Sequence, residues 1–455
     1  MDHKQYFEQI KGKRVAFLGV GVSNRPLVYK YLSYGAIVTV RDKASREKLG
    51  VTADELEKAG VRLILGDDYL KNIDEDIIFR TPGMRYFTPE LVKARQEGRV
   101  VTSEMETFFD LCPCKIFAVT GSDGKTTSTT LISLILKEAG KKVHLGGNIG
   151  TPLLPIIEDI SPDDIAVVEL SSFQLISMKK SPSVAVVTNV APNHLDIHKD
   201  MKEYIDAKKN IFLHQSKEGK LILNYDNDIT RSFVNEAKGE VLYFSRKRET
   251  NAAYCTADKK IYFNGEYIMD ASDIKLPGVH NVENYLDAIS ATYGIANAEH
   301  IKKIATTFGG VEHRMELVRE KEGVRWYNDS IATNPTRVMA GLNAIDQRII
   351  LIAGGYDKQI PFEPMGPAVC RKVKTLILTG ATKQKIYDAI VKCPDFNPNT
   401  TQIFMEDSLE DCVKRAASVA VSGDIVALSP ACASFDYYRN FEERGNHFKD
   451  MVNGL

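Results

Sequence analysis

The sequence predicts an α/β protein whose domains are built around doubly wound, mostly parallel sheets. Three observations support this class: short apolar runs rich in β-branched residues alternate with longer helical stretches, glycine-rich turns directly follow several of these runs, and the chain has 455 residues. Repeated strand–helix units form parallel sheets with right-handed crossovers. At roughly 150 residues per domain, the length predicts about three domains.

Several segments are expected to be strands because each is short and apolar on both faces, as buried parallel strands are. They are Val15–Leu18, Ile37–Val40, Ile77–Phe79, Ile116–Val119, Ile165–Val168, Val184–Thr188, Ile349–Ile352, Thr375–Leu378 and Ile425–Leu428. Helical patterns lie between most of these strands and supply the crossovers.

Two positions interrupt this alternation and are expected to be domain boundaries. Pro113 stands just before a new strand near Leu111–Cys114, and Gly309-Gly310 precedes a new pattern near Phe308–Glu312. Proline and glycine pairs are strong signals of chain breaks. The predicted domains are therefore residues 1–112, 113–311 and 312–455.

One stretch inside the second domain has a different pattern. Between Glu240 and Lys275 the chain shows short runs, such as Val241–Phe244 and Ile261–Phe263, with a turn signal at Asn264-Gly265. Short runs separated by an Asn-Gly turn are typical of antiparallel hairpins. We therefore expect a small antiparallel insert here.

The composition is that of an ordinary soluble globular protein, with 44% hydrophobic and 26% charged residues. Lys and Arg total 59 against 60 Asp and Glu, so no basic surface for nucleic acid or membranes is expected. No apolar run is long enough for a membrane span, and the first residues lack the apolar core of a signal peptide. These features favour a cytoplasmic protein.

Cysteine usage supports the same compartment. The chain has seven cysteines, an odd number, and they are scattered. The closest two form Cys112-Pro113-Cys114, which is neither a zinc-ribbon spacing nor a redox CxxC spacing. We expect free thiols in a reducing cytosol.

The strongest local motif follows the predicted strand Ile116–Val119 and reads Thr120-Gly121-Ser122-Asp123-Gly124-Lys125-Thr126-Thr127. A strand, a glycine-rich turn and a helix starting near Thr126 make a phosphate cradle, in which backbone N–H groups and a lysine face the phosphates. The hydroxyl after the lysine is suited to Mg²⁺. The strict eight-residue pattern fails because Val119 occupies its first glycine position. The structural alternative is a turn ahead of a helix.

Glu169 ends the predicted strand Ile165–Leu170, about 45 residues after the loop. A carboxylate at the end of a neighbouring strand is the usual second ligand for the Mg²⁺ of a nucleotide. The alternative is an acid that faces solvent.

The first strand is followed by a second glycine-rich turn, Gly19–Asn24, in which Asn24 replaces the third glycine of a dinucleotide fingerprint. Asp42 closes the second strand about twenty residues further on. A glycine turn with such an acid is suited to a nucleotide or sugar-phosphate ligand. NAD(P) is the weaker alternative.

A loop after Val184–Thr188 carries two imidazoles and a carboxylate, in Asn193–His198. Metal binding is one interpretation, although the spacing is not a zinc set. Shortly afterwards comes Tyr204–Lys209, for which a charged, solvated helix face is the simplest interpretation.

In the third domain, polar turns follow the predicted strands. They are Asn328-Asp329-Ser330 with Thr333-Asn334, Gly354–Lys358 and Ser429–Ser434, with Asn440–Gly445 shortly after. The carboxyl ends of parallel strands meet at one sheet edge, where ligands of open α/β sheets bind. Together these turns predict a second binding surface.

Taken in order, the motifs resemble those of the Mur ligases of peptidoglycan synthesis, and the resemblance covers nearly the whole chain. The matching segments are Gly121–Thr127, Glu169–Leu175, Asn193–His198, Lys208, His313-Arg314 and Asp329. Within the family, Glu169–Leu175, Ser429–Ser434 and Asn440–Gly445 are similar to the members that add D-glutamate.

This resemblance implies a Rossmann-like N-terminal domain for the UDP-sugar, a central ATPase-like domain with a phosphate loop, and a Rossmann-like C-terminal domain for the amino acid. It implies an ATP-dependent amide ligase that joins D-glutamate to UDP-MurNAc-L-Ala through an acyl phosphate. Two Mg²⁺ ions would assist. The expected protein is a cytoplasmic monomer that serves cell-wall synthesis, cell shape and cell division.

The resemblance also assigns individual residues. The ATP site would contain Gly121, Ser122, Asp123, Gly124, Lys125, Thr126, Thr127, Asn281, Asn284, Arg314 and Asp329. The metals would be held by Thr126, Glu169, His194 and Lys208, the last matching the carbamylated lysine of the family. The UDP-substrate would contact Val22, Ser23, Asp42, Lys43, Pro82, Gly83, Asn148, Ser171 and Gln174. D-Glutamate would contact Thr333, Lys358, Ser434 and Phe441. The catalytic residues would be Lys125, His194, Lys208 and Lys358.

The sequence departs from the family pattern at two places. Ile331 stands where many members have lysine, which removes one cation from the acceptor side, and Asn193 replaces a common acid beside His194. The alternatives are another Mur-type or folylpolyglutamate-type ligase, a non-catalytic nucleotide-binding module, and an NAD-linked dehydrogenase based on the Gly19–Asn24 turn.

Overall fold

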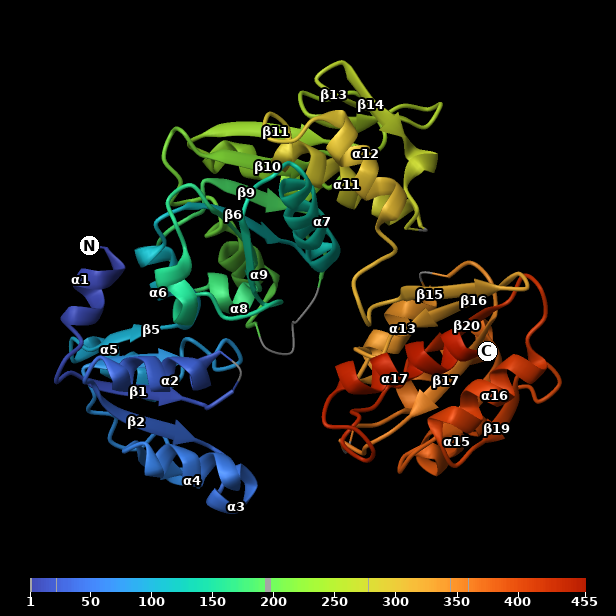
Figure 1. Cartoon of the computed structure of the whole chain (residues 1–455), viewed down its shortest axis with the longest axis horizontal. Coiled ribbons are helices and arrows are strands. Elements are labelled where there is room, and N and C mark those ends of the chain that lie inside the picture. Colours follow the sequence, from blue (N-terminus) through green and yellow to red (C-terminus); the bar gives the residue numbers. More distant parts are fainter. Residues whose placement is uncertain (1, 22, 193–197, 277, 344, 359) are drawn as a thin grey trace. The chain divides into compact units, whose positions relative to one another are not determined.

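The computed structural model describes residues 2–21, 23–192, 198–276, 278–343, 345–358 and 360–455. The chain divides into two compact units: Met1–Ile274 with Val279–Thr307, and Phe308–Leu455 with the short segment Lys275–Gly278. Figure 1 shows the elements of each unit along the chain. Among the described residues, no helix is long and apolar enough to cross a membrane.

The first unit begins with a five-stranded parallel sheet in the order β3-β2-β1-β4-β5. The strands are β1 (Arg14–Leu18), β2 (Ile37–Asp42), β3 (Arg62–Leu65), β4 (Ile77–Arg80) and β5 (Val100–Thr102). The helices are α1 (His3–Glu8), α2 (Asn24–Ser33), α3 (Arg46–Leu49), α4 (Val51–Lys58), α5 (Pro89–Gln96), α6 (Glu104–Leu111) and the 3-10 turn η1 (Gly66–Asp68). This strand order confirms the predicted Rossmann-like fold.

A six-stranded parallel sheet follows, in the order β11-β10-β9-β6-β8-β7. The strands are β6 (Lys115–Thr120), β7 (Val143–Gly147), β8 (Ile165–Glu169), β9 (Val184–Val187), β10 (Lys220–Asn224) and β11 (Glu240–Phe244). The helices are α7 (Lys125–Glu138), α8 (Ser172–Leu175), α9 (Met201–Lys209), α10 (Asp228–Ser232), α11 (Val279–Thr292) and α12 (Ala298–Thr307), with 3-10 turns η2 (Leu154–Asp159), η3 (Phe233–Glu236) and η4 (Ala271–Asp273). Helix α11 packs along α7, next to the phosphate-loop motif.

The predicted antiparallel insert exists but is smaller than expected. It consists of β12 (Ala253–Cys255), β13 (Lys260–Phe263) and β14 (Glu266–Asp270), joined in antiparallel order. Asn264 and Gly265 form the turn between β13 and β14, both with positive φ. The assignment of Val241–Phe244 to this insert is wrong, because β11 pairs parallel with β10 and extends the central sheet.

The second unit contains a six-stranded sheet in the order β15-β16-β20-β17-β18-β19, in which only the edge strand β15 is antiparallel. The strands are β15 (Glu316–Lys321), β16 (Val324–Asn328), β17 (Ile349–Gly354), β18 (Val373–Thr379), β19 (Gln402–Met405) and β20 (Ile425–Leu428). The helices are α13 (Pro335–Asn343), α14 (Gly366–Lys372), α15 (Lys383–Val391), α16 (Leu409–Val419) and α17 (Phe441–Gly454), with the 3-10 turn η5 (Glu363–Met365).

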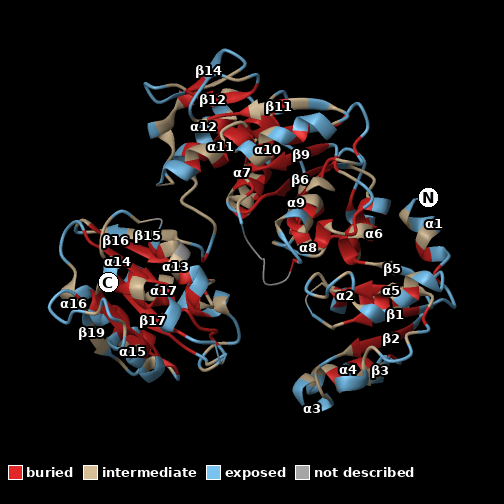
Figure 2. Cartoon of the chain, turned by 180° about the vertical axis from the view of Figure 1, so that it is seen from behind, coloured by how far each residue is buried: buried red, intermediate tan, exposed pale blue. Residues whose placement is uncertain are grey.

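Both faces of this sheet are buried. Along β17, Ile349 and Leu351 belong to one apolar cluster, whereas Ile350 and Ile352 belong to another on the opposite face. Alternate side chains of a strand point to opposite faces, so two clusters indicate helices on both sides. In Figure 2 the strands are largely buried and the outer surfaces of the helices are exposed.

All of the strands predicted from continuous apolar runs are present. The strands that were not predicted carry polar or glycine residues, for example His144 and the two glycines at the end of β7. Their strand conformation is stabilised by pairing with neighbours that are distant in the sequence, such as β8.

Candidate functional site

The phosphate-loop motif lies between β6 and α7. Gly124 is the residue before α7 and has φ of 80°, a left-handed conformation that favours glycine. A Cβ atom at Gly124 would lie 2.4 Å from Oδ1 of Asn284, and one at Gly121 would lie 1.9 Å from Oγ1 of Thr188. Both glycines are therefore needed so that the loop can approach its neighbours closely.

The lysine of the motif begins helix α7 and reaches back over the loop. The Lys125 ammonium donates hydrogen bonds to the carbonyl oxygens of Gly121 at 3.1 Å and Ser122 at 2.9 Å. Its positive charge thus lies at the N-terminal end of α7, which is the positive end of the helix dipole. This arrangement suits an anion.

Thr126 and Glu169 meet beside this loop. Thr126 is the second residue of α7, and Glu169 ends β8, which pairs with β6 so that Val119 lies opposite Glu169. The Thr126 hydroxyl donates to Oε2 of Glu169 at 2.7 Å, and Asn148 donates to Oε1 at 2.9 Å. Glu169 is 1% exposed, so the alternative of a solvent-facing acid is wrong.

Lys208 of α9 lies at the same loop. Its side chain is 1% exposed, and its ammonium donates to the Gly121 carbonyl oxygen at 2.7 Å. Burial and the nearby charge of Lys125 hold the pKa of Lys208 well below its usual range, against the weaker opposing effect of Asp123 and Glu169. The interpretation of Lys208 as part of a solvated face is therefore wrong.

The predicted metal ligand His194 lies outside the described residues, as do Asn193 and Asp196. The second imidazole of that cluster, His198, is buried and stacks on Phe173 at 5.1 Å between ring centroids. Its Nε2 is 2.8 Å from Oγ of Ser172, and its Nδ1 is 3.0 Å from Oε1 of Glu203. His198 therefore ties α8 to α9.

The two predicted adenine-contacting asparagines lie near the start of α11. Nδ2 of Asn284 donates to Oδ1 of Asn281 at 3.0 Å. Asn284 lines a pocket of about 110 Å³ together with Asp123 and Gly124 of the phosphate loop and His280 and Glu283 of α11. The structure thus brings Asn284 to the loop, more than 150 residues away in the sequence.

The first glycine turn and the acid of the second strand also meet. The Val20 N–H donates to Oδ2 of Asp42 at 3.0 Å, and Asn24 donates to the Gly19 carbonyl oxygen at 2.9 Å. A Cβ atom at Gly19 would lie 2.9 Å from Cγ2 of Thr81. Of the other predicted residues, Val22 lies outside the described residues, Ser23 precedes α2 and Lys43 is exposed.

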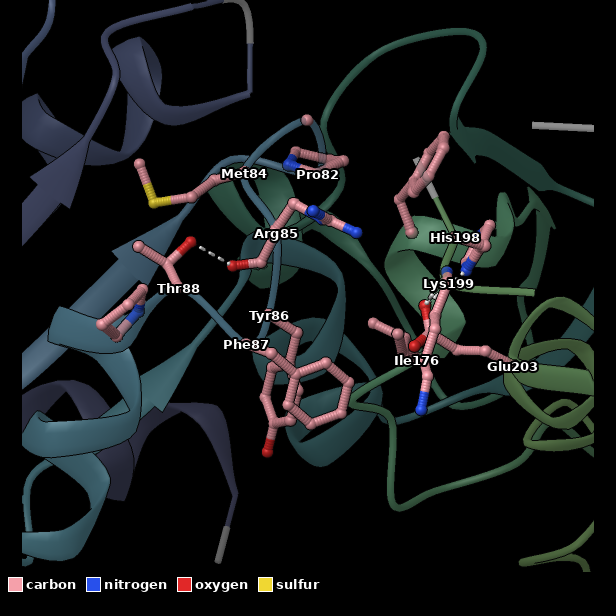
Figure 3. A pocket seen from close by; sticks show the side chains of 13 residues that line it. Pro82, Met84, Arg85, Tyr86, Phe87, Thr88, Ile176, His198, Lys199 and Glu203 are labelled. Atoms are coloured by element: carbon pink, nitrogen blue, oxygen red, sulfur yellow. Dashed lines mark hydrogen bonds and ion pairs between the residues drawn. The ribbon is translucent and has the colours of Figure 1, made fainter. Parts of the chain in front are cut away.

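The predicted diphosphate-side residues Pro82 and Gly83 line a larger cavity of about 560 Å³, drawn in Figure 3. Its other wall comes from α8, α9 and the segment before α9, and includes Phe173, Ile176 and His198. The predicted pair Ser171 and Gln174 bond to each other as the capping box of α8.

A residue missed by the sequence reasoning, Arg80, holds the two walls of this cavity together. It ends β4, is 1% exposed, and donates to the Phe173 carbonyl oxygen at 3.1 Å and to Oγ of Ser177 at 2.5 Å. In the sequence, the feature that could have pointed to Arg80 is an arginine at the end of an apolar strand. A buried charge normally requires such partners.

The predicted amino-acid residues lie in the second unit, at the carboxyl ends of its strands. The Lys358 ammonium donates to the Thr333 carbonyl oxygen at 3.2 Å. Burial lowers the pKa of Lys358, and the positive charges of Arg444 and Arg337 lower it further. Ser434 is buried, and Phe441 is the first residue of α17, so its N–H is unpaired within the helix.

Arg444 was also missed and connects these turns. It is 4% exposed and donates to Oγ of Ser330 at 3.0 Å and to the carbonyl oxygens of Ala433 at 3.0 Å and Cys432 at 3.1 Å. Ser330 in turn donates to the Phe441 carbonyl oxygen at 2.8 Å. The predicted convergence of the turns on one sheet edge is confirmed.

The third-domain residues predicted to reach ATP, Arg314 and Asp329, lie in this same unit. The Asp329 carboxylate accepts from Oγ of Ser429 at 2.6 Å and from the Met315 N–H at 3.3 Å. Burial raises the pKa of Asp329 to about 6, although these hydrogen bonds act in the opposite direction.

A parallel strand, a glycine turn and a helix, with a lysine above the turn and a Thr–Glu pair beside it, define a phosphate-loop protein. Residues 119–292 match the Mur ligase middle domain, and residues 313–432 match the glutamate ligase domain of Mur ligases. The chain therefore belongs to the Mur ligase family.

Curated relatives are similar to it over nearly their whole length. A UDP-N-acetylmuramoylalanine–D-glutamate ligase of Acetivibrio thermocellus is 54% identical over 455 residues, 98% of each chain. One from Clostridium novyi is 52% identical over 453 residues, 99% of each chain. The structure of UDP-N-acetylmuramate-alanine ligase from Thermotoga maritima has a TM-score of 0.56 at 18% identity, covering 97% of this chain and 99% of that one, which shows a shared fold.

Proposed function

We propose that this chain uses ATP to join D-glutamate to UDP-N-acetylmuramoyl-L-alanine. Relatives named as UDP-N-acetylmuramoylalanine–D-glutamate ligases share more than half of its residues over nearly their full length. The observation that carries the proposal is the phosphate loop with Lys125 above it and the Thr126–Glu169 pair at its side. The same features count against a non-catalytic nucleotide-binding module, because such a module does not require residues that hold a metal for phosphoryl transfer.

The reaction has two steps. A carboxylate oxygen of the UDP-substrate attacks the γ-phosphorus of ATP, forming an acyl phosphate while the bond to ADP breaks. The amine of D-glutamate then attacks the carbonyl carbon, loses a proton, and the tetrahedral intermediate expels phosphate. Phosphorylation is needed because the oxide of a carboxylate is a poor leaving group. The protein contributes positioning and charge neutralisation.

The ATP phosphates would lie on the N–H groups of Gly121–Thr127 with Lys125 at the β- and γ-phosphates. Thr126 and Glu169 provide a hydroxyl and a carboxylate oxygen, which are ligands that Mg²⁺ prefers. These two residues therefore fit the first of two Mg²⁺ ions, and such an ion neutralises charge on the transferred phosphoryl group.

Lys208 fits a second metal only after modification, because an amine is a poor Mg²⁺ ligand. Its lowered pKa favours the neutral amine, whose lone pair can attack carbon dioxide and form a carbamate with loss of a proton. The resulting carboxylate would hold the second Mg²⁺ together with His194.

The remaining contacts follow the family assignments. Asn281 and Asn284 would contact the adenine, and the family assignment gives Arg314 and Asp329 a role in ATP binding. The UDP-substrate would use the residues around Asp42, Gly83 and Asn148. D-Glutamate would bind at Thr333, Lys358, Ser434 and Phe441, where an ammonium and an unpaired helix N–H suit its carboxylates.

The decisive experiment offers the purified chain UDP-MurNAc-L-Ala, ATP, Mg²⁺ and a panel of amino acids. Phosphate release and product mass are measured together. We expect product only with D-glutamate. Product with a different amino acid would indicate another Mur-type ligase, and product with a folate acceptor would indicate a folylpolyglutamate-type ligase. Nucleotide binding with no product in any mixture would indicate a binding module.

The proposed substrates also place the protein in a cellular context. We propose that the chain acts in the cytoplasm, as a monomer, in the synthesis of wall precursors that support cell shape and division. Sedimentation of the purified chain near 50.8 kDa is the expected result for a monomer.

A further inference from the structure

A buried carboxylic acid lies behind the predicted adenine-contacting asparagines. Asp287 is on α11, one turn after Asn284, and is 1% exposed. We propose that Asp287 is a positioning residue that orients Asn284 and Asn281 through the hydroxyl of Ser128. This inference rests on the proposed role of the two asparagines in nucleotide binding.

The four side chains form a continuous hydrogen-bonded line from α7 to α11. Oγ of Ser128 is 2.7 Å from Oδ2 of Asp287 and 3.4 Å from Oδ1 of Asn284. Nδ2 of Asn284 then donates to Oδ1 of Asn281 at 3.0 Å. Asp287 also lines the pocket beside the phosphate loop, together with Asn284.

The Ser128 hydroxyl has a different kind of hydrogen-bond partner from those of its neighbours on α7. The hydroxyls of Thr129 and Thr130 donate to the carbonyl oxygens of Lys125 at 2.7 Å and Thr126 at 2.8 Å, one turn earlier. Hydroxyls in helices make this bond by default. Ser128 faces α11 instead, and the short contact with Asp287 accounts for its orientation.

The surroundings of Asp287 favour a neutral carboxyl group. Among the described residues, its Oδ1 has no hydrogen-bond partner, and no cation is within ion-pair distance of the side chain. Burial, with a further contribution from Glu283, raises its pKa well above the usual range, against the effect of the Ser128 hydrogen bond. The other titratable groups that line the pocket are Asp123 and His280.

The protonation state of Asp287 determines which group donates in each hydrogen bond of this line. A neutral Asp287 donates to Oγ of Ser128, and the single proton of Ser128 is then available for Oδ1 of Asn284. A charged Asp287 instead takes that proton for itself, because a charge-assisted hydrogen bond is the stronger one. Asn284 would then lose its donor, and its amide could rotate by half a turn.

The direction matters for the ligand. When Oδ1 of Asn284 faces Ser128 and Nδ2 faces Asn281, the amide oxygens of both asparagines accept hydrogen bonds, and the second N–H of the Asn284 amide can donate to a ligand. Purine rings carry nitrogen acceptors that match such donors. Asp287 would therefore act on nucleotide affinity without touching the nucleotide.

The test compares Asp287→Asn, Asp287→Ala and Ser128→Ala with the wild type. The affinity for Mg·ADP is measured by calorimetry, and the KM for ATP and kcat are measured separately. The amide introduced by Asp287→Asn keeps an N–H donor toward Ser128 at every pH, so affinity within about two-fold of the wild type is expected. Asp287→Ala loses one oriented hydrogen bond, about five-fold in affinity and in KM, with kcat nearly unchanged.

Two further readouts separate positioning from general damage. Affinity of the wild type should fall at alkaline pH, whereas that of Asp287→Asn should not. Ser128→Ala should weaken binding as Asp287→Ala does, and the double variant should be no weaker than either single one. Thermal unfolding of each variant identifies misfolded samples, and Asp287→Asn keeps the comparison valid if Asp287→Ala unfolds.

Equal affinity of Asp287→Ala and wild type, or equal weakening by Asp287→Asn, would overturn this inference and leave the proposed function standing. Failure of the wild type to bind Mg·ADP or turn over ATP would overturn both.

Discussion

The hydroxyl of Thr126 donates a hydrogen bond to the carboxylate of Glu169 across 2.7 Å, and so joins the helix after the phosphate loop to the end of the neighbouring strand. Both groups carry oxygen atoms, and both are buried. The pair has the oxygen chemistry that a hard cation prefers, which is the basis of the proposed Mg²⁺ site.

Replacing Glu169 by Gln is expected to lower kcat by about 100-fold or more, because a neutral amide neutralises less of the cation's charge. The Mg²⁺ concentration for half-maximal rate should rise. Titration of activity with Mg²⁺ measures both effects. Glu158→Gln changes an exposed acid of the same unit and should behave as the wild type. An unchanged Mg²⁺ dependence in Glu169→Gln would contradict the assignment.

Replacing Lys208 by Ala is expected to abolish nearly all turnover, and added bicarbonate or a short carboxylic acid should restore part of it. The buried space left by the side chain can hold a small carboxylate in place of the carbamate. Lys209→Ala is the matched control, since Lys209 lies on the same helix but pairs with Glu236. Full activity in Lys208→Ala would refute the metal-bridging role. Mass spectrometry under carbon dioxide should show the modification on the wild type.

Replacing Arg444 by Lys is expected to reduce the free energy of unfolding by about 2–4 kcal/mol, because one ammonium cannot replace the guanidinium donors that hold the turns around Ser330 and Cys432. Chemical denaturation measures this change. The KM for D-glutamate should rise as the turns loosen. Arg439→Lys alters an exposed residue nearby and should have little effect. Equal stability of the Arg444 and Arg439 variants would mean that the buried hydrogen bonds contribute little.

The stability of the first unit should depend on pH through Glu104. This side chain accepts hydrogen bonds from the N–H groups of Leu153 and Leu154, both at 2.9 Å, and burial raises its pKa to about 7. The folded state therefore binds this proton more tightly than the unfolded state. Its stabilising effect is complete below the unfolded pKa, near 4.5, and is lost as the pH rises to about 7.

Glu104→Gln keeps an oxygen acceptor for both N–H groups and removes the titration. Its advantage over the wild type should grow from pH 5 to pH 8, reaching about 1–3 kcal/mol. Thermal unfolding across this range measures the difference. Glu97→Gln, at a largely exposed position, is the control. A constant difference between Glu104→Gln and wild type would show that Glu104 does not titrate in this window.

Much of the architecture could be predicted because buried parallel strands are continuous apolar runs. The strands at Val15–Leu18 and Ile349–Ile352 can be recognised from their own residues, without knowledge of the strands that pair with them. The same holds for the glycine turn at Gly121–Gly124. Val241–Phe244 shows where this fails. The apolar run predicts a strand, but the partner and the direction of this strand depend on β10, which no local pattern encodes.

By itself, the sequence determined the features that short contiguous segments carry: the fold class, the phosphate loop and the order of the family motifs. Only the tertiary structure decided which charged groups leave water. Lys208, Arg80, Arg444 and Asp287 have ordinary positions in the sequence, yet each is buried by elements far along the chain. Desolvation and hydrogen bonding depend on those distant neighbours, and they shift the pKa of a buried lysine such as Lys208 below that of a solvated one.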